Sequence, residues 1–179
     1  AIPVAVYLGT WAGWNPVLHG LFFPLARFLS PIPPLVYSPF LVALSPTFQA
    51  ASLAMLILGI FFPVFLNVMF RLENIEDEIL IPARMLELSD VQMVHCILLP
   101  YILPNVLTFM KGILTSAFMI LNFAEMMGAT SGLGFYVRYF ADYGNYAKVL
   151  AGIILSGSVI LCINKLMSIL ETKLIPWRR

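Results

Sequence analysis

Long uncharged segments alternate with short polar segments along this 179-residue chain. No charged residue precedes Arg27, and none lies between Arg27 and Arg71. Within that stretch, residues 50–70 form an uncharged segment of 21 residues, which makes about 31 Å of α-helix at a rise of about 1.5 Å per residue. This length crosses the roughly 30 Å hydrocarbon core of a bilayer. The pattern therefore predicts an all-α, polytopic membrane helical bundle.

The other apolar segments predict further helices, to a total of about five spans. Residues 1–13 are expected to be the end of one span, and residues 16–29 a helix that begins at Pro16. The proline-rich residues 30–34 interrupt that helix, so residues 33–46 are expected as a short, broken helix. The last two long segments are residues 97–124 and 149–164, with a short helix expected at 135–141 between them. The chain opens inside an apolar segment with an Ala, so we expect the natural protein to begin earlier.

Residues 71–96 are the main polar interruption and hold six of the nine acidic residues. Ile75, Ile79, Ala83 and Leu86 recur at helical spacing, which predicts an amphipathic helix. Ser89, followed three residues later by Gln92, fits a capping box that begins a second helix near Asp90. Two short helices meeting near residues 86–89 would form an elbow. An ordinary solvated loop is the alternative interpretation of the same pattern.

Composition and motifs exclude several functional classes. Hydrophobic residues make up 61% of the chain and charged residues 11%, against about 45–50% and about 25% in soluble domains. No basic stripe interleaved with aromatic residues indicates nucleic-acid binding, and the two cysteines have no metal-ligand spacing. No lysine is followed by Ser or Thr, so the chain has no phosphate-binding loop of the G-x4-G-K-[ST] type. No hydrolase or metalloprotease motif occurs either.

The basic residues predict the orientation. The C-terminal tail has four basic residues and a single acidic residue, Glu171. The basic residues are Lys165, Lys173, Arg178 and Arg179. Because cytoplasmic segments carry an excess of Lys and Arg, the C-terminus is expected in the cytoplasm. Counting spans backwards then places residues 125–146 outside and residues 71–96 inside.

Four stretches resemble the type I ABC importer permeases. Residues 81–100, IPARMLELSDVQMVHCILLP, are similar to the cytoplasmic signature E-A-A-x3-G-x9-I-x-L-P, with Ala83, Ile97, Leu99 and Pro100 at matching positions. Arg84, Leu86 and Ser89 resemble the A-R-x-L-G-x-S form of the branch that imports nitrate, bicarbonate, taurine, alkyl sulfonates and thiamine precursors. The proline-rich residues 30–34, the A-E-M-x-G and G-L-G at residues 124–134, and the ending at residues 174–178 resemble the same branch.

The resemblance implies a permease fold over residues 1–179, a single transmembrane domain whose first family span is absent here. It implies that residues 71–96 form a cytoplasmic coupling loop, with a coupling helix that docks on a separate ATPase through the motif residues Ala83, Arg84, Leu86, Glu87, Leu88 and Ser89. Ile81 and Pro82 depart from the motif, and Glu87 replaces its glycine. Glycine at a helix end permits a left-handed turn that Glu adopts only at a cost, so the elbow is expected to differ in shape or to couple weakly.

Glu125 is the sharpest single candidate outside that loop, because a carboxylate that closes an apolar segment usually faces protein or water. It is expected to line a pathway or to cap the glycine-rich loop of Gly128, Gly132 and Gly134; an interfacial carboxylate in water is the alternative. Lys111 is interpreted as a lysine that reaches toward the headgroups, with attraction of an anionic substrate as the alternative. A straight helix separates Lys111 from Glu125 by about 21 Å.

The leading hypothesis is the permease subunit of an ATP-driven importer of a small solute, a small anion or a thiamine-precursor-like molecule. The resemblance implies a second permease subunit, cytoplasmic ATPase subunits that carry ATP and Mg, an extracytoplasmic substrate-binding protein, and residence in a bacterial-type inner membrane. The chain itself would bind no cofactor or metal. A secondary transporter or channel subunit is the alternative, since broken helices near the midplane fit it.

Overall fold

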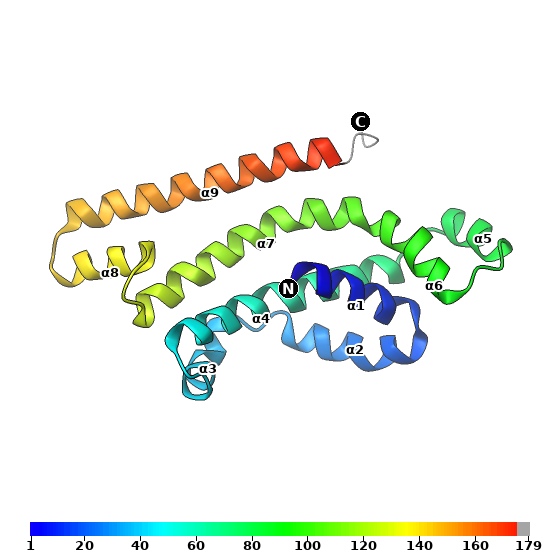
Figure 1. Cartoon of the computed structure of the whole chain (residues 1–179), viewed down its shortest axis with the longest axis horizontal. Helices are drawn as coiled ribbons and strands as arrows, with labels where there is room; N and C mark the ends of the chain where they lie inside the picture. Colours follow the sequence, from blue (N-terminus) through cyan, green and yellow to red (C-terminus); the bar gives the residue numbers. More distant parts are fainter. Residues whose placement is uncertain (175–179) are drawn as a thin grey trace. The chain divides into compact units, whose positions relative to one another are not determined.

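The computed structural model describes residues 1–174, apart from the side chains of residues 84, 170 and 172–174. The described chain is helical and contains no strand, which confirms the all-α prediction. It divides into two compact units. The first unit comprises Ala1–Ile32 and Ile60–Met110, and the second comprises Pro33–Gly59 and the chain from Lys111 onward. Helices α4 and α7 contribute residues to both (Figure 1).

The first unit begins with a helical hairpin of α1 (Ile2–Trp14) and α2 (Pro16–Leu29). Asn15 separates the two helices, because its side chain accepts hydrogen bonds from the backbone N–H groups of Val17 and Leu18 at 3.0 and 3.2 Å. Asn is a favoured N-cap residue and proline is favoured at the next position. At 13 residues, α1 measures about 20 Å.

Helix α1 approaches the later part of α4 (Phe48–Glu73) closely, because two glycines face that helix. A Cβ atom on Gly9 would lie 3.1 Å from the Cβ of Val68, and one on Gly13 would lie 2.8 Å from Cδ1 of Leu72. Small residues allow this kind of backbone approach between membrane helices. Val68 and Leu72 belong to the buried core of the first unit, together with Ala83, Met93, Val94, Leu98, Ile102 and Val106.

The polar interruption folds as two helices joined by a turn, α5 (Asp77–Met85) and α6 (Asp90–Gln92). The amphipathic helix thus begins two residues after the predicted Ile75. Helix α6 continues through the π-helical segment η2 (Met93–Leu98) into α7 (Leu99–Gly128). At the end of η2, the N–H of Leu99 donates to the carbonyl of Val94, five residues earlier in the chain. Leu99 is followed by Pro100, which has no N–H. The long apolar segment therefore begins earlier than the predicted residue 97.

The second unit contains the 3-10 turn η1 (Pro34–Tyr37), α3 (Ser38–Leu44), α8 (Leu133–Asp142) and α9 (Tyr146–Leu174). Ala51 and Met55 of α4 pack against Ile120 and Ala124 of α7 in its core. Helix α8 folds back along the start of α9 (Figure 1). The short helix predicted at 135–141 is present, and the last helix is longer at both ends than the predicted residues 149–164.

Three of the described helices are long and apolar enough to cross a membrane: Phe48–Glu73, Asp90–Gly128 and Tyr146–Ile169. A fourth span results if the helices on either side of the proline-rich segment count as one broken span. The full number of about five spans remains a prediction. Pro63 lies inside the uninterrupted α4.

Candidate functional site

The elbow between α5 and α6 is fixed at both ends by local hydrogen bonds. The Ser89 side chain accepts from the N–H of Gln92 at 3.4 Å, and the Gln92 side chain accepts from the N–H of Ser89 at 3.0 Å. This is the complete capping box that the sequence predicts. Asp90, in the first turn, adds a negative charge where the helix dipole favours it.

Glu87 occupies the place of the motif glycine and has a left-handed backbone conformation, which a glycine adopts at little cost. Its φ is 48°, the only positive φ at a non-glycine residue in the described chain. For an L-residue this left-handed conformation costs roughly 1–2 kcal/mol. The sequence analysis expects either an elbow of different shape or weak coupling. Because Glu87 adopts the left-handed conformation in spite of its cost, the turn can form without a change of shape.

The elbow has one buried face and one exposed apolar face. Ala83 is 3% exposed and packs in the core of the first unit with Met93 and Val94. On the other face, Met85 and Leu86 are 80% and 66% exposed. Ser89 is exposed, Leu88 is half-buried, and the Arg84 side chain lies outside the described part. Large exposed apolar residues on an otherwise acidic segment are typical of a surface that binds another protein.

A second tie holds the elbow to the start of the chain. The indole Nε1 of Trp14, the last residue of α1, donates to Oδ1 of Asp90 at 2.8 Å. The two residues are 76 positions apart, and no local pattern indicates that they meet. The sequence analysis therefore does not anticipate this contact.

The glycine-rich loop between α7 and α8 is organised around Glu125. Its Oε2 accepts a hydrogen bond from the N–H of Gly134 at 2.8 Å, so the carboxylate caps the loop, one of the two roles expected for it. Gly132 has φ 116° and ψ 173°, a conformation that is essentially limited to glycine. A Cβ there would collide with the Glu125 carboxylate. A Cβ on Gly128 would lie 2.9 Å from the Phe48 ring.

Arg138 of α8 holds the other side of this loop. Its Nη1 donates to the carbonyl oxygen of Met126, near the C-terminal end of α7, where a cation is favourable. Its Nε also lies 3.7 Å from Oδ2 of Asp142. Arg138 was not a candidate from the sequence, because nothing local connects it to residue 126.

Comparison with known proteins identifies the family. The profile of the binding-protein-dependent transport system inner membrane component matches residues 1–176. The chain belongs to this family. It is therefore a multi-pass inner-membrane protein of the ABC transport permease family, as the sequence motifs predict.

Several relatives of this chain are named for the solutes that they transport. It is 28% identical over 175 residues to the putative aliphatic sulfonates transport permease protein SsuC of Bacillus subtilis, covering 98% of the chain and 63% of the relative. It is 27% identical over 177 residues to the taurine transport system permease protein TauC of Escherichia coli, covering 99% and 64%. It is 25% identical over 171 residues to the nitrate import permease protein NrtB of Leptolyngbya laminosa, covering 96% and 61%. The chain thus spans less than two thirds of the length of these relatives.

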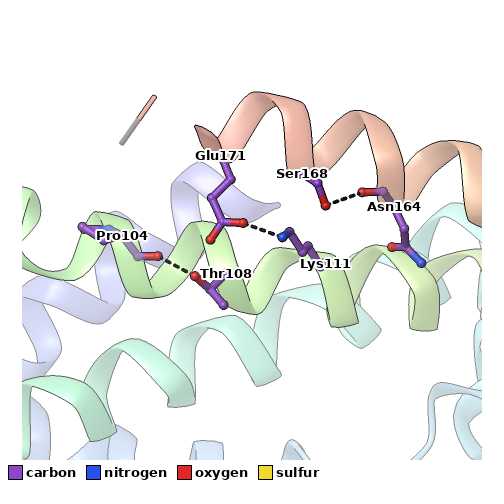
Figure 2. A network of polar contacts seen from close by, with 6 residues as sticks. All are labelled: Pro104, Thr108, Lys111, Asn164, Ser168 and Glu171. Atoms are coloured by element: carbon purple, nitrogen blue, oxygen red, sulfur yellow. Dashed lines mark hydrogen bonds and ion pairs between the residues drawn. The ribbon is translucent and has the colours of Figure 1, made fainter. Parts of the chain in front are cut away.

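Two polar contacts join α7 and α9 in the second unit, and Figure 2 shows the first of them, an ion pair. Lys111 Nζ lies 2.5 Å from Oε2 of Glu171, and both side chains are largely covered, at 33% and 18% exposure. Four residues after Lys111, the Thr115 hydroxyl donates to Oδ1 of Asn164 at 3.2 Å. The sequence analysis did not anticipate this pairing of Lys111 with a carboxylate on the neighbouring helix, and the position of Lys111 relative to the headgroups remains a prediction.

The coupling and pathway roles assigned to these residues remain predictions. The branch-like ending at residues 174–178 lies outside the described part, except for the backbone of residue 174. Among the described residues, no group of three or more His, Cys, Asp or Glu side chains forms a potential metal site.

Proposed function

We propose that this chain is a transmembrane permease subunit of an ATP-driven ABC importer. We further propose that residues 71–96 form a coupling loop whose elbow, between α5 and α6, docks on a separate ATPase. The exposed face of the elbow carries this proposal. Ile81, Met85 and Leu86 present apolar side chains at 56%, 80% and 66% exposure, while Ala83 and the capping box anchor the same elbow to the core. A rigid, anchored element with an apolar face transmits motion between a partner and the spans it joins.

ATP hydrolysis belongs to the partner in this proposal, since the chain has no phosphate-binding loop. ATP and Mg are bound by the ATPase, and the chain itself binds no cofactor. A second permease subunit, of the same or another sequence, completes the translocation path. A substrate-binding protein delivers the solute to the outer side, and membrane lipid surrounds the spans.

The proposed solute is a small anion such as nitrate, a sulfonate or bicarbonate, or a thiamine-precursor-like molecule. The similarity to permeases named for aliphatic sulfonates, taurine and nitrate supports this class. The whole chain, residues 1–179, acts as one permease domain in about five spans, with the C-terminus and residues 71–96 in the cytoplasm. Residues 125–146 lie outside.

Co-purification tests the docking assignment. The full-length protein is expressed with a candidate ATPase, and the double substitution Met85→Ser with Leu86→Ser is expected to lower ATPase retention at least about tenfold. Leu44→Ser is the matched control, because Leu44 is 82% exposed but lies on α3, outside the elbow. Equal retention by the double variant and the wild type would show that the ATPase docks elsewhere.

Cysteine labelling tests the orientation independently. Cys96 and Cys162 are exposed and are first replaced by Ser. Leu86→Cys is then expected to react with a membrane-impermeant maleimide only in inside-out vesicles, and Tyr146→Cys only in right-side-out vesicles. The opposite pattern would reverse the orientation. A solute gradient that drives uptake without any ATPase would favour the secondary transporter instead.

A further inference from the structure

A cavity of about 610 Å³ in the first unit is lined by α2, the second half of α4 and one residue of α7. Its volume lies within the range of small-molecule sites, about 300–1,000 Å³. Ser30 of the proline-rich segment contributes to the lining, as do Glu73 and Asn74 at the start of the polar segment 71–96, but none of the elbow residues 81–89 and neither Glu125 nor Lys111 does. Its polar lining comes from Arg27, Ser30, Asn67, Glu73 and Asn74.

Arg27 is the cation of this cavity. It is the only charged residue among the first 70, and its side chain is exposed. Within the described part of the chain, no ion pair involves it. Arg27 lies in the last turn of α2, where the helix dipole favours a cation. This interaction does not occupy the planar fork of N–H donors of the guanidinium group, which remains available to a ligand. Such a fork matches an oxyanion in two parallel hydrogen bonds.

Asn67 supplies the second observation. Its Oδ1 is buried and has no hydrogen-bond partner among the described residues, a state that costs free energy unless a ligand satisfies it. Because Asn67 also lines the cavity, a change of its side-chain torsion would turn the amide toward a ligand there and offer it the Nδ2 donor. Asn74 differs, because its Nδ2 already donates to the carbonyl of Phe70 at 2.8 Å.

The remaining walls are apolar and include Phe23, Leu66 and Phe109. A bare inorganic anion gains nothing from such walls, because contact with them removes its hydration without replacement. An alkyl group gains free energy from the same contact. The lining therefore combines an oxyanion-binding fork with a surface for a short hydrocarbon chain.

Glu73 is the one carboxylate of the lining, and it does not neutralise Arg27, since no ion pair joins them. It lies six residues beyond Asn67, about 9 Å along α4, in the last turn of that helix. Its side chain is exposed, so water screens its repulsion of an anion near Asn67.

We propose that this cavity binds a small organic oxyanion with a short alkyl chain, such as an alkanesulfonate, with Arg27 and Asn67 holding the oxyanion. The inference rests on the proposed transport function and narrows its solute class to organic anions over inorganic ones. It also assigns the permease itself, in addition to any binding protein, a site that distinguishes between solutes.

The test uses the full-length permease assembled with its ATPase in lipid nanodiscs, without a binding protein. Isothermal calorimetry measures binding of butanesulfonate, methanesulfonate, nitrate and butyltrimethylammonium. Butanesulfonate is expected to bind at least about tenfold more tightly than methanesulfonate, since each buried methylene strengthens binding several-fold. Nitrate is expected to bind more weakly still, and the cation with the same alkyl chain is expected not to bind.

Substitutions locate the site. Arg27→Gln is expected to weaken butanesulfonate binding at least about tenfold, Arg27→Lys less, and Asn67→Leu by several-fold. Lys148→Gln is the matched control, because Lys148 is an exposed cation of α9 outside this cavity. Size-exclusion profiles and ATPase retention establish that each variant is assembled. Absence of binding, equal binding of nitrate, or equal effects of Arg27→Gln and Lys148→Gln would overturn the proposal. Intact ATPase retention in that case would leave the transport proposal standing.

Discussion

Trp14 and Asp90 join the end of the first helix to the start of the helix that follows the elbow, through a hydrogen bond of 2.8 Å. The contact closes a loop of 76 positions, and its two partners lie next to the turn that we propose as the ATPase docking element. Motion of the elbow is therefore expected to move α1 with it, in addition to α7.

Trp14→Phe tests this link, because it keeps an aromatic ring, although a smaller one, and removes the Nε1 donor. We expect a loss of about 1 kcal/mol in stability, typical of one hydrogen bond, and a weaker stimulation of ATP hydrolysis by solute. Trp11→Phe is the control, since Trp11 packs against the same core and no hydrogen bond of its indole is found in the described chain. Equal effects of the two substitutions would reduce Trp14 to a packing role.

Glu87→Gly is expected to stabilise the protein, which is unusual for a substitution to glycine. The native φ of 48° is unfavourable for Glu and favourable for Gly. Part of the gain is offset by the greater freedom of glycine in the unfolded chain, so we expect a net gain of about 0.5–1 kcal/mol. A thermal denaturation midpoint in detergent measures it.

Leu88→Gly provides the comparison for Glu87→Gly. Leu88 lies one position further along and has no positive φ, so glycine there is expected to lower the midpoint. A decrease for both substitutions would contradict the strain assigned to Glu87.

The Lys111–Glu171 pair predicts a coupled response to substitution. Lys111→Met or Glu171→Gln alone leaves a largely covered charge without its partner, and we expect each to destabilise by about 1–3 kcal/mol, because removing one member of a covered pair is costly. The double substitution, Lys111→Met with Glu171→Gln, removes both charges. It is expected to cost less than the sum of the single substitutions.

Thermal midpoints of the four proteins form a double-mutant cycle, and additive effects would mean that the pair contributes no interaction. Lys165→Met is the control, since Lys165 is an exposed lysine of α9 outside the pair. It is expected to change the midpoint little.

Gly132→Ala is expected to disrupt the loop at the end of α7. The φ of 116° and the Glu125 carboxylate at the position of the new Cβ both oppose it, and we expect a loss of more than about 2 kcal/mol. Gly112→Ala, in α7, is the control, because nothing lies within 4 Å of its Cβ position. Glu125→Gln, which keeps an acceptor for the Gly134 N–H, is expected to be milder than Glu125→Ala.

The sequence predicts the local features of this fold well. The capping box of Ser89 and Gln92, the break at Asn15 and the helix near 135–141 all depend on residues within a few positions of one another, so their physics is visible in the chain. The contacts that tie elements together are different. Trp14 meets Asp90, and Lys111 meets Glu171, only through packing of helices far apart in sequence.

One of these distant contacts, the Lys111–Glu171 pair, could have been predicted from the charge pattern of the sequence. Lys111 is an isolated charge on a long apolar helix, and an isolated charge at membrane depth usually pairs with a charge of opposite sign. That pattern was available for Lys111, but proximity to the headgroups was the simpler interpretation. The conformation of Glu87 was also foreseeable, because the family motif places a glycine there.

The π-helical segment Met93–Leu98 has a consequence for how the elbow and the long helix are joined. A π turn amounts to one residue inserted into an α-helix. Removing a single residue from this segment therefore restores ordinary helical geometry without turning the faces on either side relative to each other. Removing one residue from α7 beyond it rotates everything that follows by about 100°. The start of this helix can therefore lose one residue without rotating the rest. Further along α7, each face must stay toward its packing partner, so the number of residues is fixed.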